Sequence, residues 1–124
     1  MKQLNFQVFP SEEKTISVED DNIYGGAHKY SVKKSKGFDN GQAIYVDETT
    51  EIQFVQKNDD GDLTPGVQSE QLAFILLDRT RKLNSRFPSS QNQKMIDGLE
   101  MFLLACYERV EERINRGVMG QLKK

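Results

Sequence analysis

The chain has 124 residues, of which 36% are apolar and 29% are charged. This length predicts one domain with a modest core, which buries roughly two-thirds of the surface of the unfolded chain. No apolar run approaches the roughly 20 residues of a membrane span, and no charged-then-apolar leader suggests export. The single cysteine, Cys106, has no partner for an internal disulfide, so we expect a reducing cytoplasm.

The net charge of −2 hides a difference between the two halves of the chain. Residues 1–64 carry 7 lysines against 12 acidic residues, whereas residues 65–124 carry 10 basic against 7 acidic residues. The basic excess of the second half is too small for a general nucleic-acid binder. We therefore expect neither a nucleic-acid polymer nor a membrane as the partner, and a small anionic ligand fits the charge better.

The first half reads as short strands. Apolar and polar residues alternate over residues 28–34, 42–48 and 50–57, as in half-buried strands. The loop residues of "GFDNG" (37–41) join the first two runs, and "NDDGD" (58–62) ends the third. This pattern predicts an antiparallel meander. We expect a further strand over residues 4–9 and a loop over residues 11–26.

The second half, after Pro65–Gly66, follows a helical period. Leu72, Ile75, Leu76 and Leu83 share one helical face, with Ser69 as the expected N-cap, and Phe87–Pro88 ends this helix. A second helix of about 27 residues is predicted to run to Arg116. Ser90 and Gln93 have the spacing of a capping box at its start, and Gly117 is its stop signal.

Two helices joined by so short a turn should pack as an antiparallel hairpin. The predicted fold class is therefore α+β, with an N-terminal strand meander (1–64) followed by a two-helix hairpin (65–124) in a single domain.

One seam of the second helix changes character along its length. Its members recur at alternating steps of three and four: Asn92, Met95, Leu99, Phe102, Cys106, Arg109, Arg113 and Arg116. The apolar middle should pack against another helix. The arginines at its end suit a phosphate group, which a guanidinium fork matches bidentately. A salt-bridged surface remains open as the alternative, since Glu108, Glu111 and Glu112 lie among the arginines.

Other candidate ligand-binding residues are the aromatic side chains of Phe74 and Phe87, the amide of Asn92, and His28 in "YGGAH" (24–28). Each also has a purely structural interpretation, as a core residue, a helix-start residue or part of a turn. With one histidine and one cysteine, the chain has no metal-ligand cluster, and no nucleophile–base arrangement is apparent. We therefore expect no catalytic residue, no metal and no cofactor.

Residues 24–124 resemble the phage and prophage Thoeris anti-defence family. The helical half carries the most specific motifs, "LLDRTRKLN.RFPS.QN" and "RV.ERI.RGVMG.LKK"; "YGGAHKY", "GFDNGQAIY" and "IQFV.K..DG...PG" resemble the strand half of the same family. The helical pair is also similar to the core of the anti-CBASS cyclic-nucleotide sponges, which lack the strands.

The resemblance implies a non-enzymatic function in the cytoplasm of an infected or lysogenic bacterial host. Members of the family bind the TIR-derived immune signal gcADPR, a cyclic ADP-ribose isomer, and so block Thoeris defence. They assemble as homodimers and higher oligomers such as hexamers, and some bind cyclic di- or trinucleotides at separate sites.

By this resemblance, Arg109 and Arg113 would clamp the pyrophosphate, Asn92 would read ribose or base, and Phe74 or Phe87 would stack on adenine. Arg116 and His28 complete the candidate set. An antiparallel neighbouring helix in a dimer would bring Asn92 of one subunit near the arginines of the other. Three alternatives remain: a sponge for the cyclic oligonucleotides of CBASS defence, an enzyme that degrades the signal, and a phage structural or DNA-associated protein.

Overall fold

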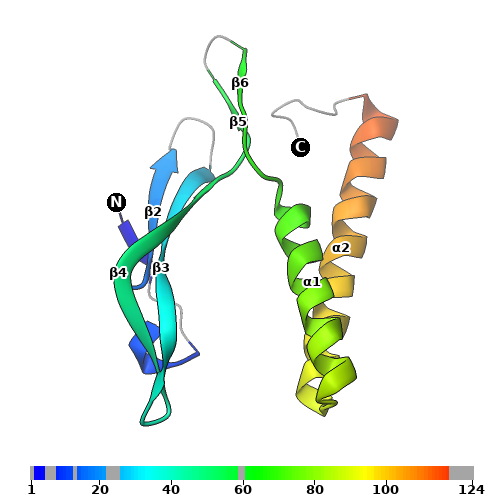
Figure 1. Cartoon of the computed structure of the whole chain (residues 1–124). Helices are drawn as coiled ribbons and strands as arrows, with labels where there is room; N and C mark the ends of the chain where they lie inside the picture. The colour runs from blue at the N-terminus through cyan, green and yellow to red at the C-terminus, as the bar shows by residue number, and fades with distance from the viewer. Residues whose placement is uncertain (1, 5–7, 13, 22–25, 59–60, 118–124) are drawn as a thin grey trace. The chain divides into compact units, whose positions relative to one another are not determined.

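The chain forms two compact units, Met1–Val67 and Gln68–Lys124, in the computed structural model (Figure 1). The structure describes residues 2–4, 8–12, 14–21, 26–58 and 61–117. The first unit contains the strands and the second contains the two helices, so the fold class is α+β as predicted. The boundary between the units follows Val67, slightly later in the chain than the expected division at Pro65–Gly66.

A four-stranded antiparallel sheet in the order β1-β2-β3-β4 dominates the first unit. Its strands are β1 (Lys2–Leu4), β2 (Ile16–Asp21), β3 (Gly26–Asp39) and β4 (Gln42–Gln53). Each strand pairs with the next one along the chain, which confirms the meander. The short strands β5 (Gln56–Lys57) and β6 (Leu63–Thr64) form a separate two-stranded sheet.

The connection between β3 and β4 is a two-residue turn. Asn40 and Gly41 both have positive φ, at 52° and 75°. A type I′ turn needs this conformation at both central positions, and the Asn-Gly dipeptide adopts it at little cost. The turn therefore sets the register in which β3 and β4 pair.

The structure corrects the strand boundaries expected from the sequence. Residues 42–48 and 50–53 form one continuous strand, β4, instead of two. The expected strand over residues 4–9 is represented only by Leu4 at the end of β1, because Val8 and Phe9 form a bend and residues 5–7 lie outside the described part.

The loop expected over residues 11–26 was wrong in its middle. Strand β2 lies there, and Ile16 and Val18 stand opposite Val32 and Tyr30 of β3. Two apolar residues followed by acidic ones give a weak local signal, and the pairing with β3 decides the conformation. Val18 becomes one of the most buried residues of the sheet unit.

A short 3-10 turn, η1 (Pro10–Glu12), lies against β4. One carboxylate oxygen of Glu12 accepts the backbone N–H groups of Val8 and Phe9, both at 2.6 Å. The other oxygen accepts the Tyr45 hydroxyl of β4 at 3.1 Å. The two backbone N–H groups, that of Phe9 first, lower the pKa of Glu12 below its ordinary value. The charged carboxylate thus fastens this turn to the sheet.

The second unit is the predicted helical hairpin of α1 (Ser69–Arg86) and α2 (Ser90–Arg116). Gly117 ends α2 in the left-handed conformation, as expected. Helix α2 has the predicted 27 residues to Arg116, but both N-caps lie one residue earlier than expected. Gln68 is the N-cap of α1, and Ser89 is the N-cap of α2, where its hydroxyl accepts the Asn92 N–H at 3.0 Å.

The helix faces that pack against each other are not the faces with the large apolar residues that the sequence predicted to be buried. On α1 the buried residues are Ala73, Leu77 and Thr80, whereas Ile75, Leu76 and Leu83 are exposed. Small side chains let two helices approach closely, and the Thr80 hydroxyl is satisfied by the Leu76 carbonyl at 2.7 Å. The larger apolar face of α1 therefore remains uncovered.

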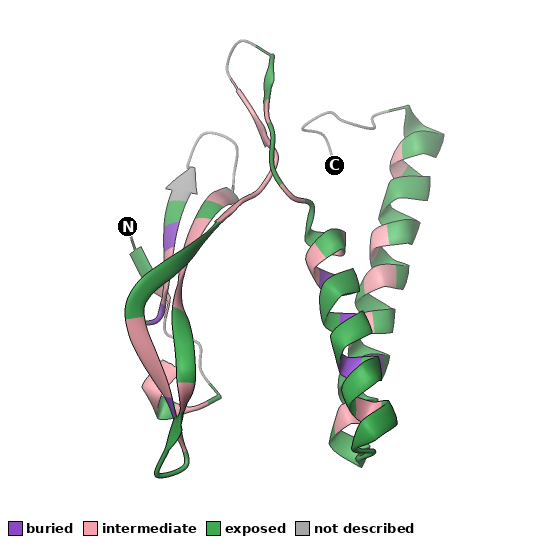
Figure 2. Cartoon of the chain, in the orientation of Figure 1, coloured by how far each residue is buried: buried purple, intermediate pink, exposed green. Residues whose placement is uncertain are grey.

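On α2 the predicted seam divides in the same way. Leu99 and Cys106 of the seam are half-buried, whereas Met95 and Phe102 are exposed, and the buried residue of α2 is Ile96, which the seam did not include. Figure 2 shows how much of both helices is exposed. Exposed large apolar residues lie on several sides of the hairpin: Phe74, Ile75, Leu76, Leu83, Phe87, Met95, Met101, Phe102, Leu104, Tyr107, Val110 and Ile114.

Candidate ligand-binding site

The arginine stripe lies on the last turns of α2. Arg109 and Arg116 are exposed and Arg113 is half-buried. Because an α-helix rises 1.5 Å per residue, Arg109 and Arg113 are separated by about 6 Å along the axis, roughly one turn. Their guanidinium groups can thus meet a single pyrophosphate from the same side.

Arg116 already has an anionic partner within the chain. It forms an ion pair with Glu112, one turn earlier, and its Nη2 donates to Glu112 Oε2 at 3.2 Å. For this residue the salt-bridged surface is the observed arrangement. Neither Arg109 nor Arg113 forms a hydrogen bond or an ion pair with another described residue.

The helix dipole explains part of the arginine stripe without a ligand. Cations in the last turn of a helix are stabilised by roughly 0.3–1 kcal/mol, and this effect falls off beyond that turn. Arg113 and Arg116 lie in the last turn of α2, but Arg109 lies before it. Arg109 also stands one turn from the like charge of Arg113, which is unfavourable. Arg109 is therefore the arginine that the isolated hairpin explains least.

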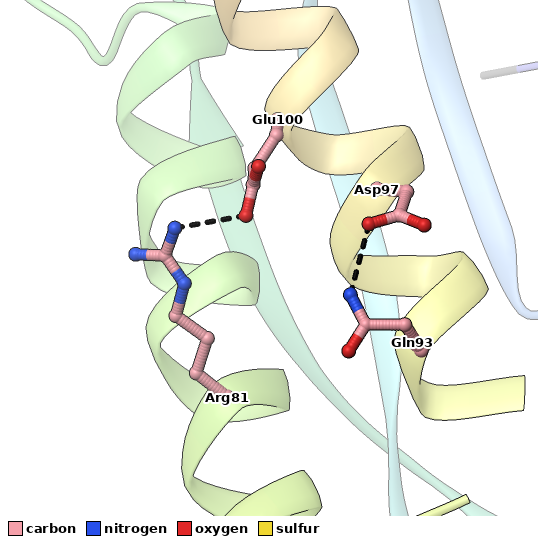
Figure 3. Close-up of polar contacts among 4 residues, drawn as sticks. All are labelled: Arg81, Gln93, Asp97 and Glu100. Atoms are coloured by element: carbon pink, nitrogen blue, oxygen red, sulfur yellow. Dashed lines mark hydrogen bonds and ion pairs between the residues drawn. The ribbon is translucent and has the colours of Figure 1, made fainter. Parts of the chain in front are cut away.

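Phe74 of α1 lies about two helical turns along the hairpin from Arg109. The ion pair between Arg81 Nη2 of α1 and Glu100 Oε1 of α2, at 3.0 Å, joins the two helices, and the extended Arg81 side chain reaches along the hairpin to Glu100 (Figure 3). Arg86 ends α1 and Ser90 begins α2 after a three-residue turn, so these two residues lie at about one level. Because the helices are antiparallel and rise equally, Phe74, twelve residues before Arg86, lies near the level of Phe102 and about 10 Å along the axis from Arg109. Its ring is exposed.

Phe87 and Asn92 lie at the opposite end of the hairpin, where the helices are joined. The side-chain amide of Asn92 donates through Nδ2 to the Phe87 carbonyl at 3.0 Å. One of its two side-chain donors is therefore used to close the turn. Seventeen residues separate Asn92 from Arg109, so the two are about 26 Å apart along α2. Within one chain the structure does not bring Asn92 to the arginines.

A further cation at this end was not singled out in the sequence. The Arg86 guanidinium carbon lies 5.3 Å from the centroid of the Phe87 ring, a cation–π arrangement. Phe87 nevertheless remains 64% exposed. Adjacency of an arginine and an aromatic residue in the chain is too common to have signalled this contact.

His28, the remaining candidate, lies on β3 in the other unit. Its side chain is half-buried, and its carbonyl accepts the N–H of Phe54 at 2.6 Å. This bond fastens the chain after β4 to β3. The observed role of His28 is thus in the sheet. Gly25 of the "YGGAH" motif lies outside the described residues, whereas Gly26 begins β3.

Among the described residues, no group of three or more His, Cys, Asp or Glu side chains is arranged to hold a metal ion. Neither described helix contains an apolar stretch long enough to cross a membrane. No protein-family model and no curated protein sequence matches the chain. The candidate site therefore consists of Arg109 and Arg113 near the end of α2, Phe74 about two turns away on α1, and Phe87 and Asn92 where the helices are joined.

Proposed function

We propose that this chain is a non-enzymatic sponge that binds and sequesters cyclic ADP-ribose isomers such as gcADPR, and thereby blocks Thoeris defence. The observation that carries the proposal is Arg109, an exposed cation that has no partner among the described residues and lies one turn from Arg113. The exposed ring of Phe74 lies about two turns away along the hairpin. A pyrophosphate would neutralise the two guanidinium groups, and an adenine would stack on the ring. The sequence resemblance described above names a ligand with both parts.

The proposed site is completed by a second copy of the chain. Asn92 is about 26 Å from Arg109 within one chain, so an antiparallel copy of α2 would bring the partner's Asn92 to the arginines. The exposed apolar residues of both helices support such an assembly, since a second copy would cover apolar side chains that the hairpin leaves exposed to water. Release of bound water from these side chains would drive it.

A compact cyclic ligand suits tight binding. It loses little conformational freedom when it binds, so more of the contact energy appears as affinity. Charge-assisted hydrogen bonds to a phosphate are each worth roughly 1.5–3 kcal/mol. A sponge requires this tight binding and no chemical step.

A sponge for cyclic di- or trinucleotides is the second candidate, either instead of this function or at a separate site in addition to it. The observation that favours it is the Arg86–Phe87 pair at the other end of the hairpin, which offers a cation and an exposed aromatic face far from Arg109. Variants at Arg86 and at Arg109 would then affect different ligands.

Titration calorimetry with a cyclic ADP-ribose isomer tests the proposal. We expect Arg109→Ala and Arg113→Ala each to weaken binding about ten- to a hundred-fold. Arg116→Ala should cost less, because Arg116 is already paired with Glu112. Lysine at position 109 should restore only part of the affinity, since it lacks the bidentate fork.

Arg79→Ala is the matched control, an exposed arginine of α1, and should bind like the native protein. Circular dichroism confirms that each variant is folded. Native affinity in both Arg109→Ala and Arg113→Ala would contradict the proposed site.

A further inference from the structure

The chain returns to the sheet unit just before the helical hairpin begins. After β4, residues 56–64 leave as the β5–β6 hairpin, and Val67 then comes back to the end of β4. The Val67 N–H donates to the Gln53 carbonyl at 2.8 Å, and the Val55 N–H donates to the Val67 carbonyl at 3.1 Å. Val67 thus forms a one-residue parallel bridge with Phe54.

Gly66 is what permits this approach. A Cβ atom at this position would lie 2.5 Å from the Gln53 carbonyl oxygen and 2.6 Å from the Val55 nitrogen. Both obstacles are backbone atoms of the strand, so they cannot turn aside as a flexible side chain could. Only glycine allows the chain to run so close to the end of β4.

The residues on either side of this contact are also constrained. Thr64 is paired in β6, and proline fixes the φ angle of residue 65. Gln68, the next residue after Val67, is already the N-cap of α1, and its N–H donates to Gln71 Oε1 at 2.8 Å. Val67 is therefore hydrogen-bonded to the sheet unit, and the next residue, Gln68, is already hydrogen-bonded within α1.

We infer that residues 65–67 form a strap that belongs to the sheet unit, and that the helical hairpin pivots about the single connection between Val67 and Gln68. A Pro-Gly pair between two units ordinarily reads as a flexible linker. Here Gly66 removes flexibility, because it lets the backbone bond to the strand. With the strap attached, only the bond between Val67 and Gln68 joins the two units. If the strap detaches, the connecting segment lengthens by residues 65–67. This inference does not depend on the proposed ligand.

Amide hydrogen exchange of the full-length protein, followed by NMR, tests the strap. In the native protein we expect the Val55 and Val67 amides to be protected, as sheet amides are. Gly66→Ala should speed exchange at both by at least about tenfold while the amides of α2 are unchanged. Gly98→Ala is the matched control: nothing lies within 4 Å of a Cβ at Gly98, so protection of both amides should persist.

Val67→Pro supplies a second variant in case Gly66→Ala unfolds the sheet unit. Proline cannot donate to the Gln53 carbonyl, so the Val55 amide should lose its protection while β3 and β4 remain paired. Exchange of the Val55 and Val67 amides at the unprotected rate in the native protein would overturn the inference. Unchanged protection of the Val55 amide in both Gly66→Ala and Val67→Pro would overturn it as well.

Discussion

Phe102→Asp should weaken self-association of the chain strongly. Phe102 lies in the middle of α2 and is 45% exposed in the isolated chain. Full burial of a phenylalanine side chain is worth about 1.5–3 kcal/mol, so covering the exposed part would contribute about 1 kcal/mol per protomer. A two-fold interface counts each residue twice, which gives about 2 kcal/mol and about a thirty-fold change in the dissociation constant. Burying the new carboxylate adds a further cost.

Sedimentation velocity over a range of micromolar concentrations measures this effect. We expect the native protein to sediment as a dimer or a larger assembly and Phe102→Asp to shift toward monomer. Leu63→Asp is the matched control, because Leu63 is an exposed apolar residue of β6 outside the hairpin. A native protein that is monomeric, or a Phe102→Asp variant that assembles like the native protein, would refute the reasoning.

Two predictions concern the sheet unit. Because hydrogen bonds lower the pKa of Glu12 below its ordinary value of 4.5, its contribution to stability is present above that pH and is lost as the pH falls below it. Chemical denaturation between pH 3 and 7, roughly the range that brackets this titration, should show a shallower acid loss for Glu12→Gln than for the native protein; equal slopes would contradict this. Lys14 has a φ of 64°, so Lys14→Gly should stabilise the unit by roughly 0.5–1 kcal/mol, and a lower melting temperature would contradict this.

Local signals were enough to predict the helical hairpin. Pro88 and Gly117 act on their own backbone, so the ends of the helices could be read from the chain to within one residue. The Asn40–Gly41 turn was equally local. These features need no knowledge of what packs against them.

Features that depend on distant contacts could not be predicted in this way. Strand β2 has little apolar periodicity, and it forms because Ile16 and Val18 meet β3. Periodicity pointed to the large apolar face of α1, but Ala73 and Thr80 pack against α2 because they are small. Gly66 looked like part of a linker, and only the backbone of β4 beside it explains the residue.

In the candidate site, too, local features could be predicted from the sequence and features that depend on distant contacts could not. The pairing of Arg116 with Glu112 follows from their i, i+4 spacing and was foreseeable as the alternative to ligand binding. The separation of about two turns between Phe74 and Arg109 depends on the register of the two helices, which the short turn between Arg86 and Ser90 sets. The separation of Asn92 from the arginines follows from helix geometry, and it is the reason that a second copy is needed.

The central claim is that the chain holds an intact signal and does not convert it. The most direct measurement is to incubate the protein with a cyclic ADP-ribose isomer, remove the free ligand, denature the protein by heat and identify what is released. The account predicts intact cyclic ligand in a fixed ratio to protomers. Linear ADP-ribose formed beyond that ratio, or no retained ligand, would contradict it.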